Sequence, residues 1–281
     1  MTRWWSRRRF INSTWGLGIV GLPAGRVPEI AQRPAGTDAV GESRLGDVPA
    51  SWPQQDPAVV REMVGVCHRD VARVRELVER QPALANAAID WGFGDWEDAL
   101  GAASHVGRRE IAEVLLAHGA RPSIFSAAML GQLDVVKALV AARPGVQQTH
   151  GPHGITLMAH ARAGGADAAP VVKYLETLGD ADRRLTTRPL DAQDRDAVVG
   201  RYAFGAGPRD YLEVDVQNDQ LGIIRPGATR HFLHHAGALT FFPSGVPSVT
   251  IAFARAGGRV AQLTVADRSR HVTARKSETQ L

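Results

Sequence analysis

Apolar residues recur at helical spacing through the first part of the chain and at every second position through the last part. From Pro57 onward, successive apolar stretches have the three- and four-residue spacing of amphipathic helices. After Asp182 the spacing changes to two, which predicts short strands. The pattern therefore predicts a helical part followed by a strand-rich part, joined by the polar segment 183–194.

The helical part repeats one unit, of which residues 98–120 are the clearest copy. Small residues let one short helix press closely on another, Gly107 ends that helix, and Ile111 begins the buried face of a second. Equivalent second helices begin at positions separated by 40, 24 and 36 residues, namely Val71, Ile111, Val135 and Val171. Two short helices cannot bury such a face alone, so we expect the copies to stack.

Residues 100–120 resemble the ankyrin repeat, whose pattern is T-P-L-H-x-A-A-x-x-G-H-x-E-I-V-x-L-L-x-x-G-A. The sequence departs from this pattern at its start, where Asp98-Ala99 stands in place of Thr-Pro. The resemblance extends over about residues 55–182, where the mean separation of the copies is about 33 residues, the ankyrin period. It implies an α-solenoid of about four ankyrin-like helix pairs, in a domain that we place at 55–184. Most ankyrin folds bind proteins, so the implied role is protein–protein interaction through finger loops and a concave helix face.

The longest insertion between helices, residues 82–97, carries two tryptophans and a phenylalanine beside several acidic residues. Aromatic side chains next to a few charges are the usual components of a binding hot spot. We therefore predict that this loop binds a protein partner; the alternative is that the tryptophans cover the edge of the helix stack. The predicted partner-binding residues are Trp91, Phe93, Asp95, Trp96, His150 and His153.

The sequence carries no recognisable catalytic or metal-binding motif. A nucleophile elbow, a phosphate-binding loop and an H-E-x-x-H helix are all missing. The three histidines in 150–160 are spaced as metal ligands could be, but a loop histidine more commonly hydrogen-bonds the backbone. The three histidines in 231–235 would divide between the two faces of a strand, which is awkward for binding one ion. A position on the solvent-facing side of the barrel is the simpler interpretation. The single cysteine, Cys67, excludes a disulfide within the chain and a cysteine zinc site. We expect no catalytic residue, metal or cofactor.

The strand-rich part contains eight short alternating runs between residues 198 and 274, separated by Gly, Pro and Asn-Asp turn signals. They predict a small antiparallel β-barrel of about eight strands, in a domain at 185–281. The part resembles the lipocalin-like β-domain at the C-terminus of some β-lactamase-like hydrolases, on residues that include 200–202, Phe241 and Phe242. Five phenylalanines could surround an apolar ligand or simply fill the barrel, namely Phe204, Phe232, Phe241, Phe242 and Phe253.

The N-terminus has a basic start and a glycine-rich apolar run too short to span a bilayer. It is similar to the twin-arginine signal S-R-R-x-F-L at Ser6, Arg7, Arg8, Phe10 and Ile11. The resemblance implies a signal peptide at 1–31, a flexible leader at 32–54, and export by the bacterial twin-arginine machinery to the periplasm or beyond. A disordered basic tail is the alternative.

Charge argues against nucleic acid as a partner. The formal net charge is +4, but residues 1–24 hold four arginines and no acid, so the remainder has 29 basic and 29 acidic residues. The fold class we predict is a multidomain α plus all-β chain, the α-solenoid first and the barrel second. The function we predict is non-enzymatic binding of a protein partner by an exported chain with no membrane span in its mature form. The alternatives are a carrier of a small apolar ligand and an accessory subunit of an exported enzyme.

Overall fold

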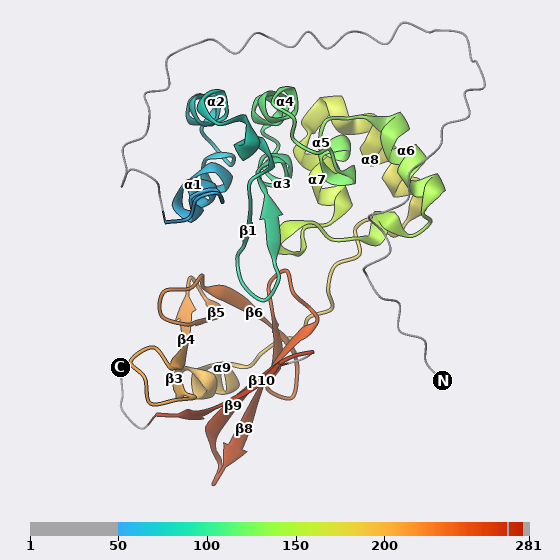
Figure 1. Cartoon of the computed structure of the whole chain (residues 1–281). Coiled ribbons are helices and arrows are strands. Elements are labelled where there is room, and N and C mark those ends of the chain that lie inside the picture. Colours follow the sequence, from blue (N-terminus) through green and yellow to red (C-terminus); the bar gives the residue numbers. More distant parts are fainter. Residues whose placement is uncertain (1–49, 269, 278–281) are drawn as a thin grey trace, which may run out of the picture. The chain divides into compact units, whose positions relative to one another are not determined.

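The computed structural model describes residues 50–268 and 270–277 (Figure 1). The predicted signal peptide and the leader up to residue 49 lie outside the described residues. Helices come first and strands second, as the hydrophobic spacing predicts. The first eight α-helices are α1 (Pro57–Val66), α2 (Val71–Arg80), α3 (Ala99–His105), α4 (Arg109–Ala117), α5 (Ile124–Met129), α6 (Leu133–Ala142), α7 (Leu157–Ala163) and α8 (Ala169–Leu178).

Short polar side chains cap the helices where the sequence changes from turn to apolar run. Asp70 accepts a hydrogen bond from the backbone N–H of Arg73, so it is the N-cap of α2. Asp98 caps α3 in the same way, and Thr156 caps α7. These caps satisfy N–H groups that have no partner inside the helix, so they fix where each helix begins.

The first helices of successive pairs pack on one another, but not in a single file. Helix α3 contacts α5, α5 contacts α7, and α7 also contacts α3. In a strictly linear solenoid each repeat touches only its neighbours. The structure thus has helices where we predicted them, and an α-solenoid of ankyrin pairs is not shown by these contacts.

The insertion between α2 and α3 is structured. It contains the 3₁₀ helix η2 (Pro82–Asn86) and the antiparallel strands β1 (Ala88–Asp90) and β2 (Trp96–Asp98). Three consecutive residues of the connecting loop, Gly92, Phe93 and Gly94, have positive φ. The tight turn directs the loop toward the barrel, where Phe93 packs against His231 with ring centroids 5.2 Å apart.

The strand-rich part is a closed antiparallel barrel of eight strands, as predicted. The strands are β3 (Gly200–Ala203), β4 (Tyr211–Gln217), β5 (Gln220–Ile224), β6 (His231–Gly237), β7 (Thr240–Pro243), β8 (Val249–Ala256), β9 (Arg259–Asp267) and β10 (Arg270–Lys276), and β10 closes on β3. Tyr202, Phe241 and Leu263 are among its fully buried residues. Phe232 is 41% exposed, so it does not belong to the interior where we expected it.

Helix α9 (Ala192–Val198) was not predicted, since its residues read as part of the polar connection. Asp191 caps it by accepting a hydrogen bond from the N–H of Asp194. Its last residue, Val198, is buried in the barrel core, and the carbonyl of Val198 accepts a hydrogen bond of 2.7 Å from the Tyr202 hydroxyl.

Within the described residues, no helix is both long enough and apolar enough to cross a membrane.

Candidate functional site

Two histidines and one glutamate bring three ligand-type atoms together under the helices. His105 Nε2 lies 2.9 Å from Glu97 Oε1 and 3.1 Å from His68 Nε2. His68 Nε2 lies 3.5 Å from the same Glu97 oxygen. Ligand atoms bound tetrahedrally to zinc at about 2.0–2.1 Å lie roughly 3.3 Å apart, so the three atoms, which are also within hydrogen-bond reach of one another, are close enough together to hold one ion. We call these residues the His₂Glu cluster.

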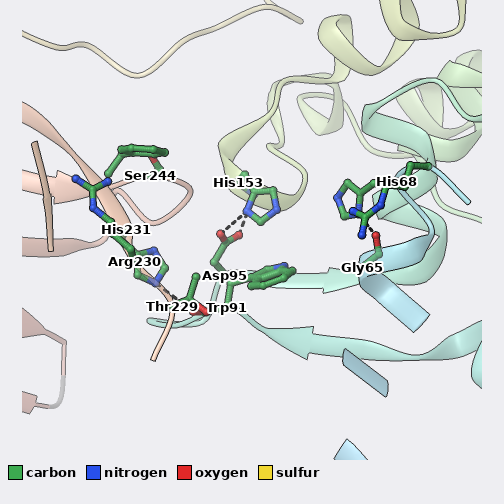
Figure 2. A pocket seen from close by; sticks show the side chains of 11 residues that line it. Gly65, His68, Trp91, Asp95, His153, Thr229, Arg230, His231 and Ser244 are labelled. Carbon is green, nitrogen blue, oxygen red and sulfur yellow. Dashed lines mark hydrogen bonds and ion pairs between the residues drawn. The ribbon is translucent and has the colours of Figure 1, made fainter. Parts of the chain in front are cut away.

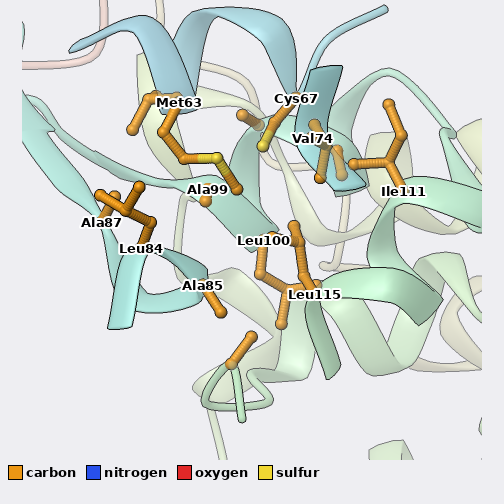
Figure 3. Packing of buried hydrophobic residues seen from close by; sticks show 14 of the residues in the cluster. Met63, Cys67, Val74, Leu84, Ala85, Ala87, Ala99, Leu100, Ile111 and Leu115 are labelled. Carbon is orange, nitrogen blue, oxygen red and sulfur yellow. The ribbon is translucent and has the colours of Figure 1, made fainter. Parts of the chain in front are cut away.

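Three different elements supply the cluster. His68 follows the end of α1, Glu97 is the middle residue of β2, and His105 is the last residue of α3. The underlying core contains Met63 from α1, Cys67 at the C-cap of α1, and Leu100 from α3 (Figure 3). Burial raises the pKa of the Cys67 thiol to about 12, so this cysteine is a packing group and not a thiolate ligand. The apolar core therefore fixes the helix ends that carry the two histidines.

The hydrogen bonds around the cluster determine which ring nitrogen faces inward. His68 Nδ1 lies 3.1 Å from the carbonyl of Val64 and 3.2 Å from that of Gly65, and only an N–H can bond there. In the neutral ring the lone pair is then on Nε2, the atom that faces Glu97 and His105. Metal-binding histidines have this arrangement, with the second nitrogen donating to a carbonyl or carboxylate.

Glu97 is fully buried and its two oxygens have separate roles. Oε2 accepts a hydrogen bond of 2.7 Å from the indole N–H of Trp91, which leaves Oε1 for the histidines. Burial acts to raise the pKa of Glu97, but its contacts with His105, His153 and His68 outweigh burial and hold that pKa far below its usual value. The buried carboxylate is therefore charged and needs cations around it.

His153 and Asp95 form a second pair beside the cluster (Figure 2). His153 Nδ1 donates to Asp95 Oδ2 over 2.8 Å, its backbone N–H donates to Oδ1 over 2.9 Å, and its Nε2 lies 3.4 Å from Glu97 Oε1. Burial acts to lower the pKa of His153, but the two carboxylates outweigh burial and raise it to about 9. His153 has a left-handed backbone with φ of 59°, a conformation that is unfavourable for a residue other than glycine. The loop holds this ring in place at the expense of local strain, which is typical of functional sites.

A fourth histidine lies behind the cluster. His160 on α7 is fully buried, and neither of its ring nitrogens has a hydrogen-bond partner among the described residues. Its ring centroid lies 6.3 Å from that of His105 and 4.8 Å from that of Phe125. Burial, together with the nearby His105, lowers the pKa of His160 to about 4, so the ring is neutral at pH 7.

Substitution of His160 by leucine is expected to stabilise the protein, by about 1 kcal/mol at pH 7, because an apolar residue replaces an unsatisfied polar ring. The gain should grow as the pH falls. Between the unfolded pKa of 6.5 and the folded pKa of about 4, the unfolded chain takes up a proton at His160 and the folded chain does not. Wild-type stability is lost over that window, by on the order of 2 kcal/mol at pH 5.

Urea denaturation of wild-type protein and of His160→Leu at pH 7 and pH 5 measures this effect. His271→Leu, at an exposed position of β10, is the control. A stability difference between wild type and His160→Leu that is the same at both pH values would contradict the explanation.

A pocket of about 530 Å³ opens beside the cluster, with His68 and His153 in its wall. Trp91 and Phe232 supply aromatic surface, and Thr229 and Ser244 supply hydroxyl groups. Figure 2 shows Asp95 and His153 between His231 on one side and His68 on the other. This volume is within the range of ligand pockets, about 300–1,000 Å³.

The predicted partner-binding residues have different environments in the structure. Trp91 is half-buried and bonds Glu97, Phe93 packs on the barrel, and Asp95 is buried against His153. Trp96 is 63% exposed, so it is the aromatic residue of the hairpin with most surface for a partner. His150 Nε2 bonds the backbone carbonyl of Arg183 over 2.9 Å.

The histidines of β6 are more buried than we predicted. His231 is 7% exposed, and its Nε2 lies 3.1 Å from the carbonyl of Trp91. A β-carbon at Gly92 would lie 2.5 Å from that ring nitrogen, which explains the glycine at this point of the loop. His234 bonds the hydroxyl of Ser244, and His235 bonds the carbonyl of Pro189. The three rings therefore bond to three separate partners.

The sequence predicts neither the His₂Glu cluster nor the complete burial of His160. His68, Glu97 and His105 have no motif spacing, because they come from the ends and edges of three elements. One signal was present: His68 and His105 both lie at the C-terminal end of the first helix of a pair. Stacking the predicted helix pairs on one another would have placed the rings of His68 and His105 near each other.

Comparison with known proteins gives no further guidance on the site. No protein-family model matches the chain, and no curated protein matches it either.

Proposed function

We propose that the protein binds one divalent transition-metal ion through His68 Nε2, His105 Nε2 and Glu97 Oε1. The observation that carries this proposal is the convergence of the three atoms within 2.9–3.5 Å of one another. The buried charge of Glu97 supports it, because a buried carboxylate is stabilised by a cation beside it, and the neutral His68 ring would offer its Nε2 lone pair to the same point.

The ligand types narrow the choice of ion. Two imidazoles and one carboxylate suit zinc and ferrous iron, whereas calcium and magnesium prefer oxygen ligands alone. Three protein ligands also leave coordination positions for water or another molecule, as in catalytic zinc sites. We therefore take Zn²⁺ as the probe and Mg²⁺ as the negative control.

Isothermal titration of the full chain, prepared without a histidine tag, tests the proposal. Wild-type protein is expected to bind about one Zn²⁺ per chain, and His105→Ala, which removes a direct ligand, is expected to lose more than ~100-fold in affinity. His118→Ala is the matched control, since that ring bonds the carbonyl of Val114 at the end of α4. Equal Zn²⁺ binding by the two variants would contradict the proposal.

A second candidate is binding of a protein partner by an exported, ankyrin-like helix stack. The observation that favours it is Trp96, 63% exposed on a hairpin that also lines a pocket with Phe125 and Pro152. Large exposed aromatic residues are common hot spots. This role is compatible with metal binding, because Trp96 is outside the His₂Glu cluster.

Trp96→Ala should remove partners that the wild-type chain retains in a pull-down from its native extract. Trp52→Ala is the control, since Trp52 is 69% exposed and belongs to the segment before α1. If both variants retain the same partners, Trp96 is not the contact residue.

A further inference from the structure

A second pocket, of about 380 Å³, lies beside the exposed face of strand β2. Trp96 and Asp98 on that face line it, together with Phe125 and Pro152 from the helical part. From the chemistry of this lining we infer that the pocket binds a methylated ammonium group, such as the trimethylammonium group of choline. The site is separate from the His₂Glu cluster, and its occupant is a small organic cation, unlike the protein partner considered above.

The two faces of β2 have different environments. Glu97 is completely buried, whereas its neighbours Trp96 and Asp98 project from the other face and are exposed, Trp96 by 63%. Asp90 of β1 is the antiparallel partner of Trp96, so it lies on that exposed face as well. The indole ring therefore has one carboxylate two positions along its own strand and another directly across the hairpin.

Two apolar side chains from the helical part complete the lining. Phe125 is the second residue of α5, and Pro152 begins the 3₁₀ helix η4 (Pro152–Gly154). The Phe125 ring packs against the fully buried His160, with ring centroids 4.8 Å apart, so the helical core fixes its position. Aromatic ring faces attract cations, and indole does so most strongly. The pocket thus has one exposed and one anchored aromatic ring as surface for a cation.

Most polar side chains of the lining already have hydrogen-bond partners. Asp95 accepts two hydrogen bonds from His153. Ser123 caps α5, and the ring of His150 bonds a backbone carbonyl. Asp98 uses Oδ1 to cap α3, and its Oδ2 has no hydrogen-bond or ion-pair partner among the described residues. The pocket therefore offers aromatic surface and one free carboxylate oxygen, but few other groups that accept hydrogen bonds.

This combination selects a cation that donates no hydrogen bonds. A primary ammonium or a hydrated metal ion would lose hydrogen bonds to water that the pocket does not replace. A methylated ammonium loses none, and its methyl groups present the positive charge to the aromatic faces. Among the described residues that line the pocket there is no lysine or arginine to repel it. The volume is also within the usual range of ligand pockets.

Isothermal titration of the full chain with choline, in buffer that contains a chelator, tests the inference without the metal site. Wild-type protein is expected to bind choline with a Kd below ~1 mM, and to bind the uncharged tert-butyl analogue, in which carbon replaces nitrogen, at least ~10-fold more weakly. Trp96→Leu should lose about 10-fold in choline affinity, because leucine keeps an apolar side chain but removes the ring. Asp98→Asn should lose about 3-fold, because asparagine keeps the helix cap and removes the charge.

Trp52→Leu and Asp134→Asn are the matched controls, since both side chains are exposed and lie before α1 and on α6. No binding of choline, equal affinity for the uncharged analogue, or unchanged affinity in Trp96→Leu would each overturn the inference. Because the titration uses pure protein without metal, such a result leaves the proposed zinc site and the proposed protein partner untouched.

Sedimentation with phosphatidylcholine vesicles identifies the source of the cation once choline binds. If wild-type protein sediments with the vesicles and Trp96→Leu does not, the pocket takes the trimethylammonium group of a lipid. If neither sediments, its ligand is a free methylated ammonium compound.

Discussion

Glu97→Gln should abolish most metal binding while leaving the fold in place. Loss of a residue that only supports a metal ligand costs about 10–100-fold in affinity, so loss of a direct carboxylate ligand should cost more than ~100-fold. The amide is the same size as the carboxylate, and its oxygen can still accept the hydrogen bond from the Trp91 indole. The expected loss of Zn²⁺ affinity therefore comes from the missing charge and the missing ligand, and not from a cavity in the core.

Competition for Zn²⁺ with a chromophoric chelator measures this affinity, and circular dichroism checks that the helices remain. Glu113→Gln is the control, because the Glu113 side chain on α4 is 61% exposed. Wild-type affinity in Glu97→Gln would show that the buried carboxylate has another purpose, and it would remove the main support for the metal site.

Gly107→Ala should destabilise the protein by more than ~3 kcal/mol, through a backbone collision between helix pairs. Gly107 joins α3 to α4 with φ of +70°, and an added β-carbon would lie 2.1 Å from the carbonyl oxygen of Ala163 at the end of α7. A backbone carbonyl cannot rotate away as a side chain can. The substitution therefore forces α3 and α7 apart.

Gly119→Ala separates the collision from the conformational preference of glycine. Gly119 also has a positive φ, +87°, but no atom lies within 4 Å of its added β-carbon. This variant should lose only the roughly 1–2 kcal/mol that a left-handed residue costs. Thermal or urea unfolding measures the stability of both variants. Equal losses of stability would mean that the turn between α3 and α4 does not press on α7.

The secondary structure could be predicted because hydrophobic spacing is a local property. The alternating runs of the C-terminal part became eight strands, and sequential hairpins joined them into a closed barrel. Helix α9 was missed because its short sequence is polar, and only the packing of Val198 into the barrel core reveals why it is there. The mutual contacts of α3, α5 and α7 depend on tertiary packing and have no local signal.

The candidate site could not be predicted, for a different reason. The hairpin residues appeared to form a finger for a partner, but Asp95 bonds His153 and Phe93 packs on the barrel, and Trp91 bonds Glu97 within the hairpin itself. Glu97 itself seemed to be one acid among several. Its burial, which makes the charged carboxylate depend on cationic neighbours, is a property of the folded chain alone.

The central claim is that His68, His105 and Glu97 hold one ion, and X-ray absorption of the zinc-loaded full chain tests it most directly. We expect a first shell of nitrogen and oxygen at about 2.0–2.1 Å, with the outer-shell signal of two imidazole rings. In His105→Ala that signal should fall to the level of a single ring. A wild-type spectrum without imidazole scattering, or one unchanged in His105→Ala, would contradict the claim.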